Sequence, residues 1–144
     1  MQTPVIRRLE IADAEAISRI YTAITREPAE ADFDTMVGET VQGRNDCSFV
    51  AEMDGRVVGY MIGSVLRGVF GIKNGAWLSM MGVAPQFMGQ GIGERLADAF
   101  FAEAKARGLK HVYTSVRWDS TDLLSYFKRL GFDRSNFINL LKRL

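Results

Sequence analysis

Apolar and polar positions follow two different periods along the chain, which predicts a mixed α/β fold. Continuous or alternating apolar runs, typical of β-strands, occupy residues 5–9, 48–53, 57–69, 76–83, 111–117 and 136–142. Apolar residues at helical spacing occupy residues 11–25, 29–41, 91–107 and 120–130. The order β-α-α-β-β-β-α-β-α-β predicts a mixed sheet with helices on both faces.

Glycines mark several ends and close contacts of these elements. Asp54-Gly55 lies between two strands and predicts a type I′ hairpin. Gly59 and Gly63 interrupt the third strand, where they are expected to be either weak points of the strand or sites of close approach to its backbone. Gly108 is expected to end the helix that precedes it.

Length and composition bound the class of protein. A chain of 144 residues predicts a single domain, 1–144. Apolar content of 47% and charged content of 24% are ordinary for a globular protein, and a net charge of +1 does not suggest nucleic-acid binding. Cys47 is the only cysteine, which fits a reducing, cytoplasmic location. No leader peptide or membrane span is expected. A metal site built from His and Cys clusters is excluded, because the chain has one histidine and one cysteine.

The chain is organised around residues 83–96, V-A-P-Q-F-M-G-Q-G-I-G-E-R-L. An apolar strand leads into a glycine loop, and a helix leads out. The first N–H groups of a helix lack partners, and the helix dipole makes them attractive to phosphate. A P-loop would need Gly-Lys-Ser/Thr, and a dinucleotide fingerprint would need G-x-G-x-x-G, so neither fits the alternating glycines.

The stretch resembles the central signature of the GNAT superfamily of acyl-CoA-dependent N-acetyltransferases, V-x-P-x-x-[RQ]-G-x-G-[IL]-G-x-x-L. The matching residues are Val83, Pro85, Gly89, Gly91, Ile92, Gly93 and Leu96. Met88 stands where the family has Arg or Gln. Residues 120–132 resemble a second, less specific family segment. The resemblance implies a mixed, mostly antiparallel sheet of about six to seven strands flanked by about four helices.

The resemblance also implies transfer of an acetyl group from acetyl-CoA, as co-substrate, to a primary amine without a metal. In the family, acyl-CoA enters between the central strand and the next strand. By position, the backbones of Met81 and Val83 would pair with the pantetheine arm. The pyrophosphate would be held by Met88, Gly89, Gln90, Gly91, Ile92 and Gly93.

The residues that would move protons are harder to assign. The tyrosine that the family is proposed to use as acid aligns with Phe127, and Tyr126 lies one residue earlier. Either Tyr126 is the general acid or no side-chain acid is used. Residues 77–83 contain no carboxylate, so the general base stays open, and Ser79 could only position water.

An acidic segment surrounds Pro28, in the region that walls the acceptor pocket of the family. Glu27, Glu30, Asp32 and Asp34 form this segment. They could steer and deprotonate a cationic amine, but a solvated acidic helix start is the favoured interpretation. Polyamines, amino acids, antibiotics and protein amines all stay open as acceptors.

Two alternatives to an enzyme are kept. Met88, Phe127 and the missing strand carboxylate favour a non-catalytic acyl-CoA-binding regulatory domain of the same fold. A nucleotide-binding module of another fold is disfavoured by the glycine spacing. A homodimer would be in keeping with the family, and no nucleic-acid or membrane partner is expected.

Overall fold

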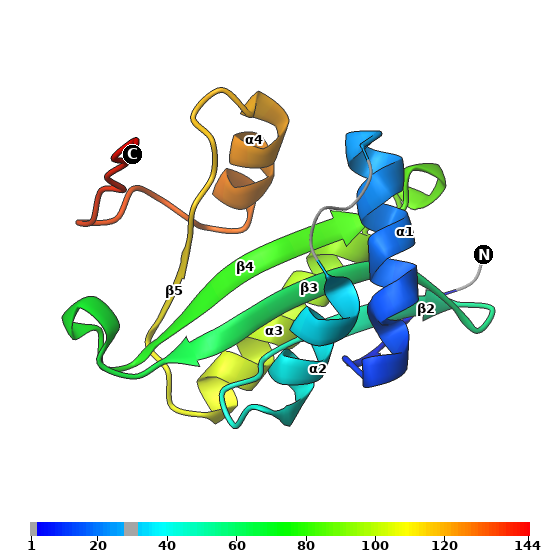
Figure 1. The fold of residues 1–144 in the computed structure, drawn as a ribbon, viewed down its shortest axis with the longest axis horizontal. Helices are drawn as coiled ribbons and strands as arrows, with labels where there is room; N and C mark the ends of the chain where they lie inside the picture. The colour runs from blue at the N-terminus through cyan, green and yellow to red at the C-terminus, as the bar shows by residue number, and fades with distance from the viewer. Residues whose placement is uncertain (1–2, 28–31) are drawn as a thin grey trace. The chain divides into compact units, whose positions relative to one another are not determined.

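The computed structural model describes residues 3–27 and 32–144, which form two compact units, 1–114 and 115–144 (Figure 1). The elements are β1 (Val5–Arg8), α1 (Ala14–Thr25), α2 (Phe33–Gln42), β2 (Phe49–Met53), β3 (Arg56–Leu66), β4 (Gly75–Val83), α3 (Ile92–Ala106), β5 (His111–Thr114) and α4 (Thr121–Arg129).

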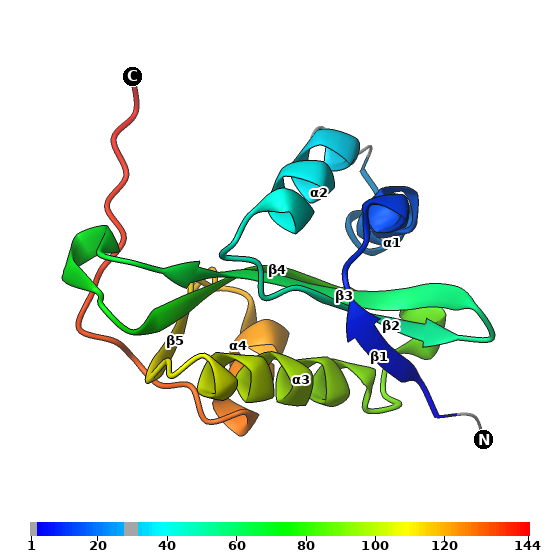
Figure 2. The same ribbon diagram turned by 90° about the horizontal axis from the view of Figure 1, so that it is seen from below.

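The first unit is a five-stranded sheet in the order β1-β2-β3-β4-β5. Neighbouring strands are antiparallel except β4 and β5, which are parallel. Figure 2 shows α1 and α2 on one face of this sheet and α3 on the other. The predicted mixed, mostly antiparallel sheet with helices on both faces is therefore confirmed.

The strand count is lower than the six to seven expected, because residues 136–142 are not a strand. Phe137 and Ile138 are adjacent apolar residues, as are Leu140 and Leu141, so a strand here would need cover on both faces. Instead, Ile138, Leu140 and Leu141 are each more than 80% exposed.

Several element boundaries also differ from the prediction, by one to four residues, and the start of α1 at Ala14 follows a 3-10 turn, Ile11–Asp13, that the prediction counted as helix. The third strand ends at Leu66 rather than at residue 69, because Gly68 turns the chain with φ +84° into a short 3-10 turn, Val69–Gly71. The last strand of the sheet ends at Thr114 rather than at residue 117. The second helix begins at Phe33 after its N-cap Asp32, while the predicted start at residue 29 lies outside the described residues.

Local turn predictions are confirmed. Asp54 and Gly55 both have positive φ, +54° and +75°, as a type I′ hairpin requires. Gly108 follows α3 with φ +76°.

Apolar side chains from α1, α2 and the sheet form the core on one face, among them Ile17, Val37 and Tyr60. On the other face α3 packs directly on the glycines of β3. A Cβ at Gly63 would lie 2.2 Å from Cε2 of Phe100, which confirms the predicted close approach.

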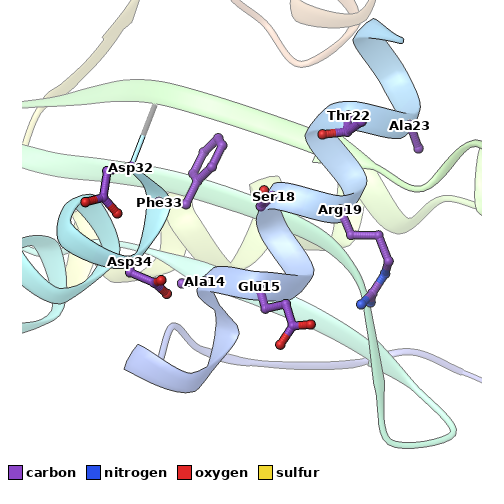
Figure 3. A pocket seen from close by; sticks show the side chains of 9 residues that line it. All are labelled: Ala14, Glu15, Ser18, Arg19, Thr22, Ala23, Asp32, Phe33 and Asp34. Atoms are coloured by element: carbon purple, nitrogen blue, oxygen red, sulfur yellow. The ribbon is translucent and has the colours of Figure 1, made fainter. Parts of the chain in front are cut away.

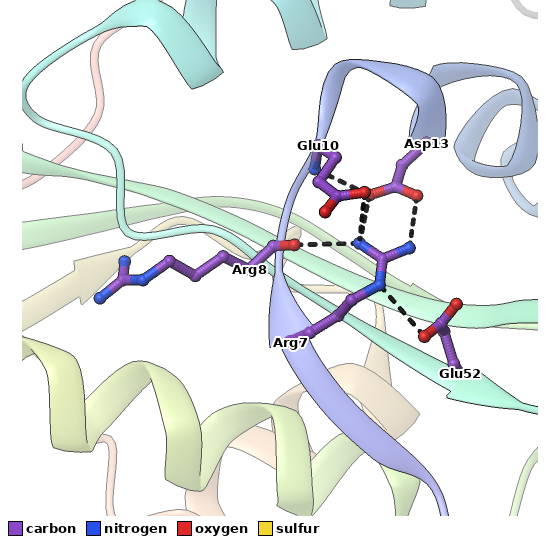
Figure 4. A network of polar contacts seen from close by, with 5 residues as sticks. All are labelled: Arg7, Arg8, Glu10, Asp13 and Glu52. Atoms are coloured by element: carbon purple, nitrogen blue, oxygen red, sulfur yellow. Dashed lines mark hydrogen bonds and ion pairs between the residues drawn. The ribbon is translucent and has the colours of Figure 1, made fainter.

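A charged network joins the start of α1 to the sheet (Figure 4). The Arg7 guanidinium donates to both carboxylate oxygens of Asp13, at 2.8 and 2.9 Å, and lies 3.1 Å from Glu52 on β2. Asp13 is buried and also accepts the N–H of Glu10 at 2.8 Å. These carboxylates raise the pKa of Arg7 despite its partial burial. The network fixes one end of α1 over β1 and β2.

The second unit contains α4 and the C-terminal residues. Ser120 is the N-cap residue, as predicted, but its side chain makes no capping hydrogen bond. The ring of Phe127 contacts Tyr126 and Phe132, each at 5.2 Å between centroids. The Asn139 amide donates to the hydroxyl of Ser115 at 2.8 Å. No helix among the described residues is long and apolar enough to cross a membrane.

Candidate functional site

The glycine loop lies between β4 and α3, and its backbone conformation requires glycine. Gly89 and Gly91 have φ of +80° and +79°, a region in which other L-residues are strained. A Cβ on either residue would meet nothing within 4 Å. Glycine is therefore needed here for backbone shape, and the space above the loop is open to a ligand.

The loop presents backbone donors at the start of α3. Within the ranges 3–27 and 32–144, no acceptor is found for the N–H groups of Gly89, Gln90, Gly91 and Ile92. The first three residues are exposed, while the Ile92 side chain is buried and anchors the helix. Unpaired donors at the positive end of a helix dipole suit an anion, and this chemistry fits a pyrophosphate.

Met88 immediately precedes the first glycine of the loop, and its side chain is uncharged. Its side chain is 53% exposed, and its backbone has extended ψ just before the first glycine. Any anion held here is held by backbone amides rather than by the Arg or Gln side chain of the family pattern.

One edge of β4 is open for half of its length. β5 pairs only with residues 75–78 of β4, whereas β4 continues to Val83 with β3 as its only partner strand among the described residues. Met81 and Val83 lie on this unpaired stretch and are partly buried. An extended chain such as a pantetheine arm can pair with such an edge.

A β-bulge marks the place where the pairing with β5 stops. On β3, Ile62 pairs with Met80 but the next residue, Gly63, pairs with Leu78. Ser79 is thus the extra residue of β4, and it is exposed. A bulge increases the local bend and twist of its strand and is common beside functional sites.

Two hydroxyls lie at this bulge, and sequence reasoning missed their role. The Ser79 hydroxyl donates to the carbonyl of Ile62 at 3.1 Å. The Thr114 hydroxyl donates to the carbonyl of Leu78 at 2.8 Å. The only sequence signal was a polar residue, Ser79, within an otherwise continuous apolar run.

Tyr126 and Phe127 belong to the second unit. Tyr126 is half-buried and its ring packs edge-on against Phe127, which is 5% exposed. The proposed role of Tyr126 as general acid stays a prediction.

The acidic segment contributes to a pocket of about 830 Å³ between α1 and α2 (Figure 3). The residues that line it are Ala14, Glu15, Ser18, Arg19, Thr22, Ala23, Asp32, Phe33 and Asp34. Asp32 accepts from the N–H and the hydroxyl of Thr35, at 3.1 and 2.7 Å, and these bonds lower the pKa of Asp32. Glu27 does not line the pocket, and Glu30 lies outside the described residues.

This pocket opens away from the sheet. At about 100° per residue, Glu15, Ser18 and Thr22 form a stripe of α1 roughly opposite the core residues Ile17 and Ile20. Of the described residues in the acidic segment, Asp32 and Asp34 line this pocket.

Within the part of the chain that the structure describes, no three His, Cys, Asp or Glu side chains are grouped so that they could hold a metal ion.

The sequence model of the acetyltransferase (GNAT) family matches residues 14–132. The fold is also similar to solved structures. The ribosomal-protein-S18-alanine N-acetyltransferase of Escherichia coli has a TM-score of 0.77 at 22% identity, over 93% of this chain and 80% of that one. The aminoglycoside N-acetyltransferase AAC(6')-Iy in complex with CoA has a TM-score of 0.82 at 17% identity, over 98% and 95%. A transcriptional regulator from Bacillus halodurans C-125 has a TM-score of 0.82 at 20% identity, over 99% and 100%.

Proposed function

The chain belongs to the GNAT family of acetyltransferases and is an acyltransferase, and we propose that it transfers the acetyl group of acetyl-CoA to a primary amine of a small molecule or a protein. One observation supports this most directly. The unpaired edge of β4 is followed, after a short 3-10 turn, by a glycine loop in which the N–H groups of residues 89–92 have no acceptor among the described residues. The first feature suits the pantetheine arm and the second suits the pyrophosphate.

We assign the pyrophosphate to the loop from Met88 to Gly93. Each amide donating to a charged oxygen contributes on the order of 1.5–3 kcal/mol. Because Met88 brings no charge, the backbone amides carry this interaction. The pantetheine arm pairs with the backbones of Met81 and Val83, on the part of β4 that β5 leaves free.

In the proposed reaction, the amine nitrogen forms a bond to the thioester carbonyl carbon, and the C–S bond breaks. The thioester supplies an activated acyl group. A lysine-like amine has a pKa of about 10.4, so a proton must be removed before attack. The leaving thiolate, with a pKa of about 8.5, accepts a proton, and we assign Tyr126 as its donor. No metal is needed for these steps.

The acceptor is proposed only as a primary amine. Asp32 is engaged as the N-cap of α2, which supports the interpretation of the acidic segment as a solvated helix start. We place the reaction in the cytoplasm, in one domain that spans residues 1–144, with a homodimer as the expected assembly.

A regulatory acyl-CoA-binding domain without catalysis is the second candidate. The observation that favours it is the lack of a carboxylate on β4, together with Phe127 in place of the family's tyrosine. Such a domain would bind acetyl-CoA and release no CoA.

Two measurements separate these functions. Acetyl-CoA is expected to raise the melting temperature, while NAD and ATP are not, and an equal response to all three would contradict the CoA site. A screen of polyamines, amino acids, aminoglycosides and peptide amines for CoA release then tests catalysis. If acetyl-CoA binds and no amine releases CoA, the regulatory candidate replaces the enzyme.

For an active amine, an unchanged turnover number in Tyr126→Phe would rule out Tyr126 as the acid.

A further inference from the structure

Two side-chain hydroxyls flank the point where β4 parts from β5. The Ser79 hydroxyl, on the bulge, reaches back to β3 and donates to the carbonyl of Ile62. The Thr114 hydroxyl, on the last residue of β5, donates to the carbonyl of Leu78. Leu78 is also the last residue of β4 that pairs with β5.

Each hydroxyl donates to a strand carbonyl at a point where regular pairing is interrupted. A carbonyl that points along the sheet normally accepts a backbone N–H of the next strand. The Thr114 side chain donates to the carbonyl of Leu78, so the pairing of β4 with β5 can end here without leaving that carbonyl unpaired. Ser79 satisfies the carbonyl of Ile62 at the irregular register, which holds the extra residue in β4 rather than elsewhere along the strand.

We propose that Ser79 and Thr114 are positioning residues that fix where the open edge of β4 begins. This inference rests on the proposed function. The residue at which pairing with β5 stops decides where an arm on that edge can start to pair, and hence where the thioester lies relative to the amine. The glycine loop lies beyond the other end of the unpaired stretch, so the nucleotide half of CoA does not depend on these hydroxyls.

The test compares acetyl-CoA with 3′-phospho-ADP, the half of CoA that lacks the pantetheine arm, by isothermal titration. Ser79→Ala and Thr114→Val are each expected to weaken acetyl-CoA binding about fivefold, the size of one hydrogen bond. Binding of 3′-phospho-ADP should stay unchanged. Ser79→Thr and Thr114→Ser keep the hydroxyl and should restore acetyl-CoA binding.

Thr40→Val is the matched control, because it loses a similar hydroxyl bond, to the carbonyl of Met36 at 2.8 Å on α2. It should leave both affinities as in the wild type. Ser79→Ala removes one exposed oxygen and is expected to fold, so the test does not depend on Thr114→Val alone.

Three results would overturn the inference. Acetyl-CoA affinity could be unchanged in Ser79→Ala and Thr114→Val, both ligands could weaken equally, or the hydroxyl-preserving variants could fail to restore binding. A wild-type protein that binds neither ligand would instead refute the proposed function, and with it this inference. That result needs no variant, so the two failures are distinguishable.

Discussion

The two halves of β4 have different surroundings although they are continuous in one strand. Residues 75–78 pair with β3 and β5, whereas residues 80–83 pair with β3 alone and Ser79 is the extra residue between the two halves. The first half is a structural element held on both edges. The second half keeps one edge available and leads into the glycine loop. The comparison shows that a short β5 and one extra residue can give a central strand an accessible edge.

Packing explains why the paired half tolerates little change. Gly63 of β3 pairs with Leu78, and the ring of Phe100 from α3 lies directly on it. The neighbouring carbonyl of Trp77 would be 2.7 Å from a Cβ at this position. A backbone atom cannot move aside as a flexible side chain can, so this half has no room for adjustment.

The largest effect is therefore expected for Gly63→Ala. The overpacking should lower the free energy of unfolding by about 3 kcal/mol, measured by urea denaturation. Gly38→Ala is the control, because a Cβ there meets nothing within 4 Å and the residue lies in α2. This control should be neutral or slightly stabilising. Equal midpoints for the two variants would show that the paired half is looser than its packing indicates.

The unpaired half is open at its edge but covered on its face. Tyr60 pairs with Gly82, and a Cβ at Gly82 would lie 2.9 Å from the Tyr60 hydroxyl and from Cδ1 of Ile24. Tyr60 is 2% exposed. Burial, with a smaller contribution from Tyr21, raises the pKa of Tyr60 to about 12.

This burial predicts a specific sensitivity to alkali. The folded state keeps the Tyr60 proton to about pH 12, whereas the unfolded chain loses it near the ordinary pKa of about 10. Stability should therefore fall as the pH rises between these values, by about 3 kcal/mol in total. Tyr60→Phe should remove this part of the alkaline loss, seen as a smaller change in the urea midpoint between pH 9 and pH 12. An identical pH profile would mean that the ring is not held neutral over Gly82.

Much of this arrangement could be predicted because its signals are local. The continuous apolar run predicted β4, and the close approach at Gly63 followed from a glycine inside a strand. The alternating glycines predicted a strand-loop-helix unit, which the structure contains. These features depend on backbone conformation or periodicity within a few residues, which a single sequence carries.

The bulge and the strand ends could not be predicted in the same way. The extra residue at Ser79 is defined by its register against β3, a partner strand earlier in the chain. β5 stops at Thr114 although its alternation continues for three residues, because pairing needs a neighbour and not only a pattern. Residues 136–142 were misjudged for the same reason: apolar content alone does not make a strand.

The smallest effect is expected where the open half of β4 enters the loop. In Gly91→Ala, a side chain is forced to φ of +79°, which costs about 1–2 kcal/mol of stability. The loop relieves part of this strain by turning its amides away, so acetyl-CoA binding should also weaken about tenfold. Gly108→Ala is matched in strain, with φ of +76° and nothing within 4 Å, but it lies at the far end of α3. It should lose similar stability and keep its affinity. Equal affinities in the two variants would show that the conformation of the loop does not govern binding, which would remove the functional distinction between the two halves of β4.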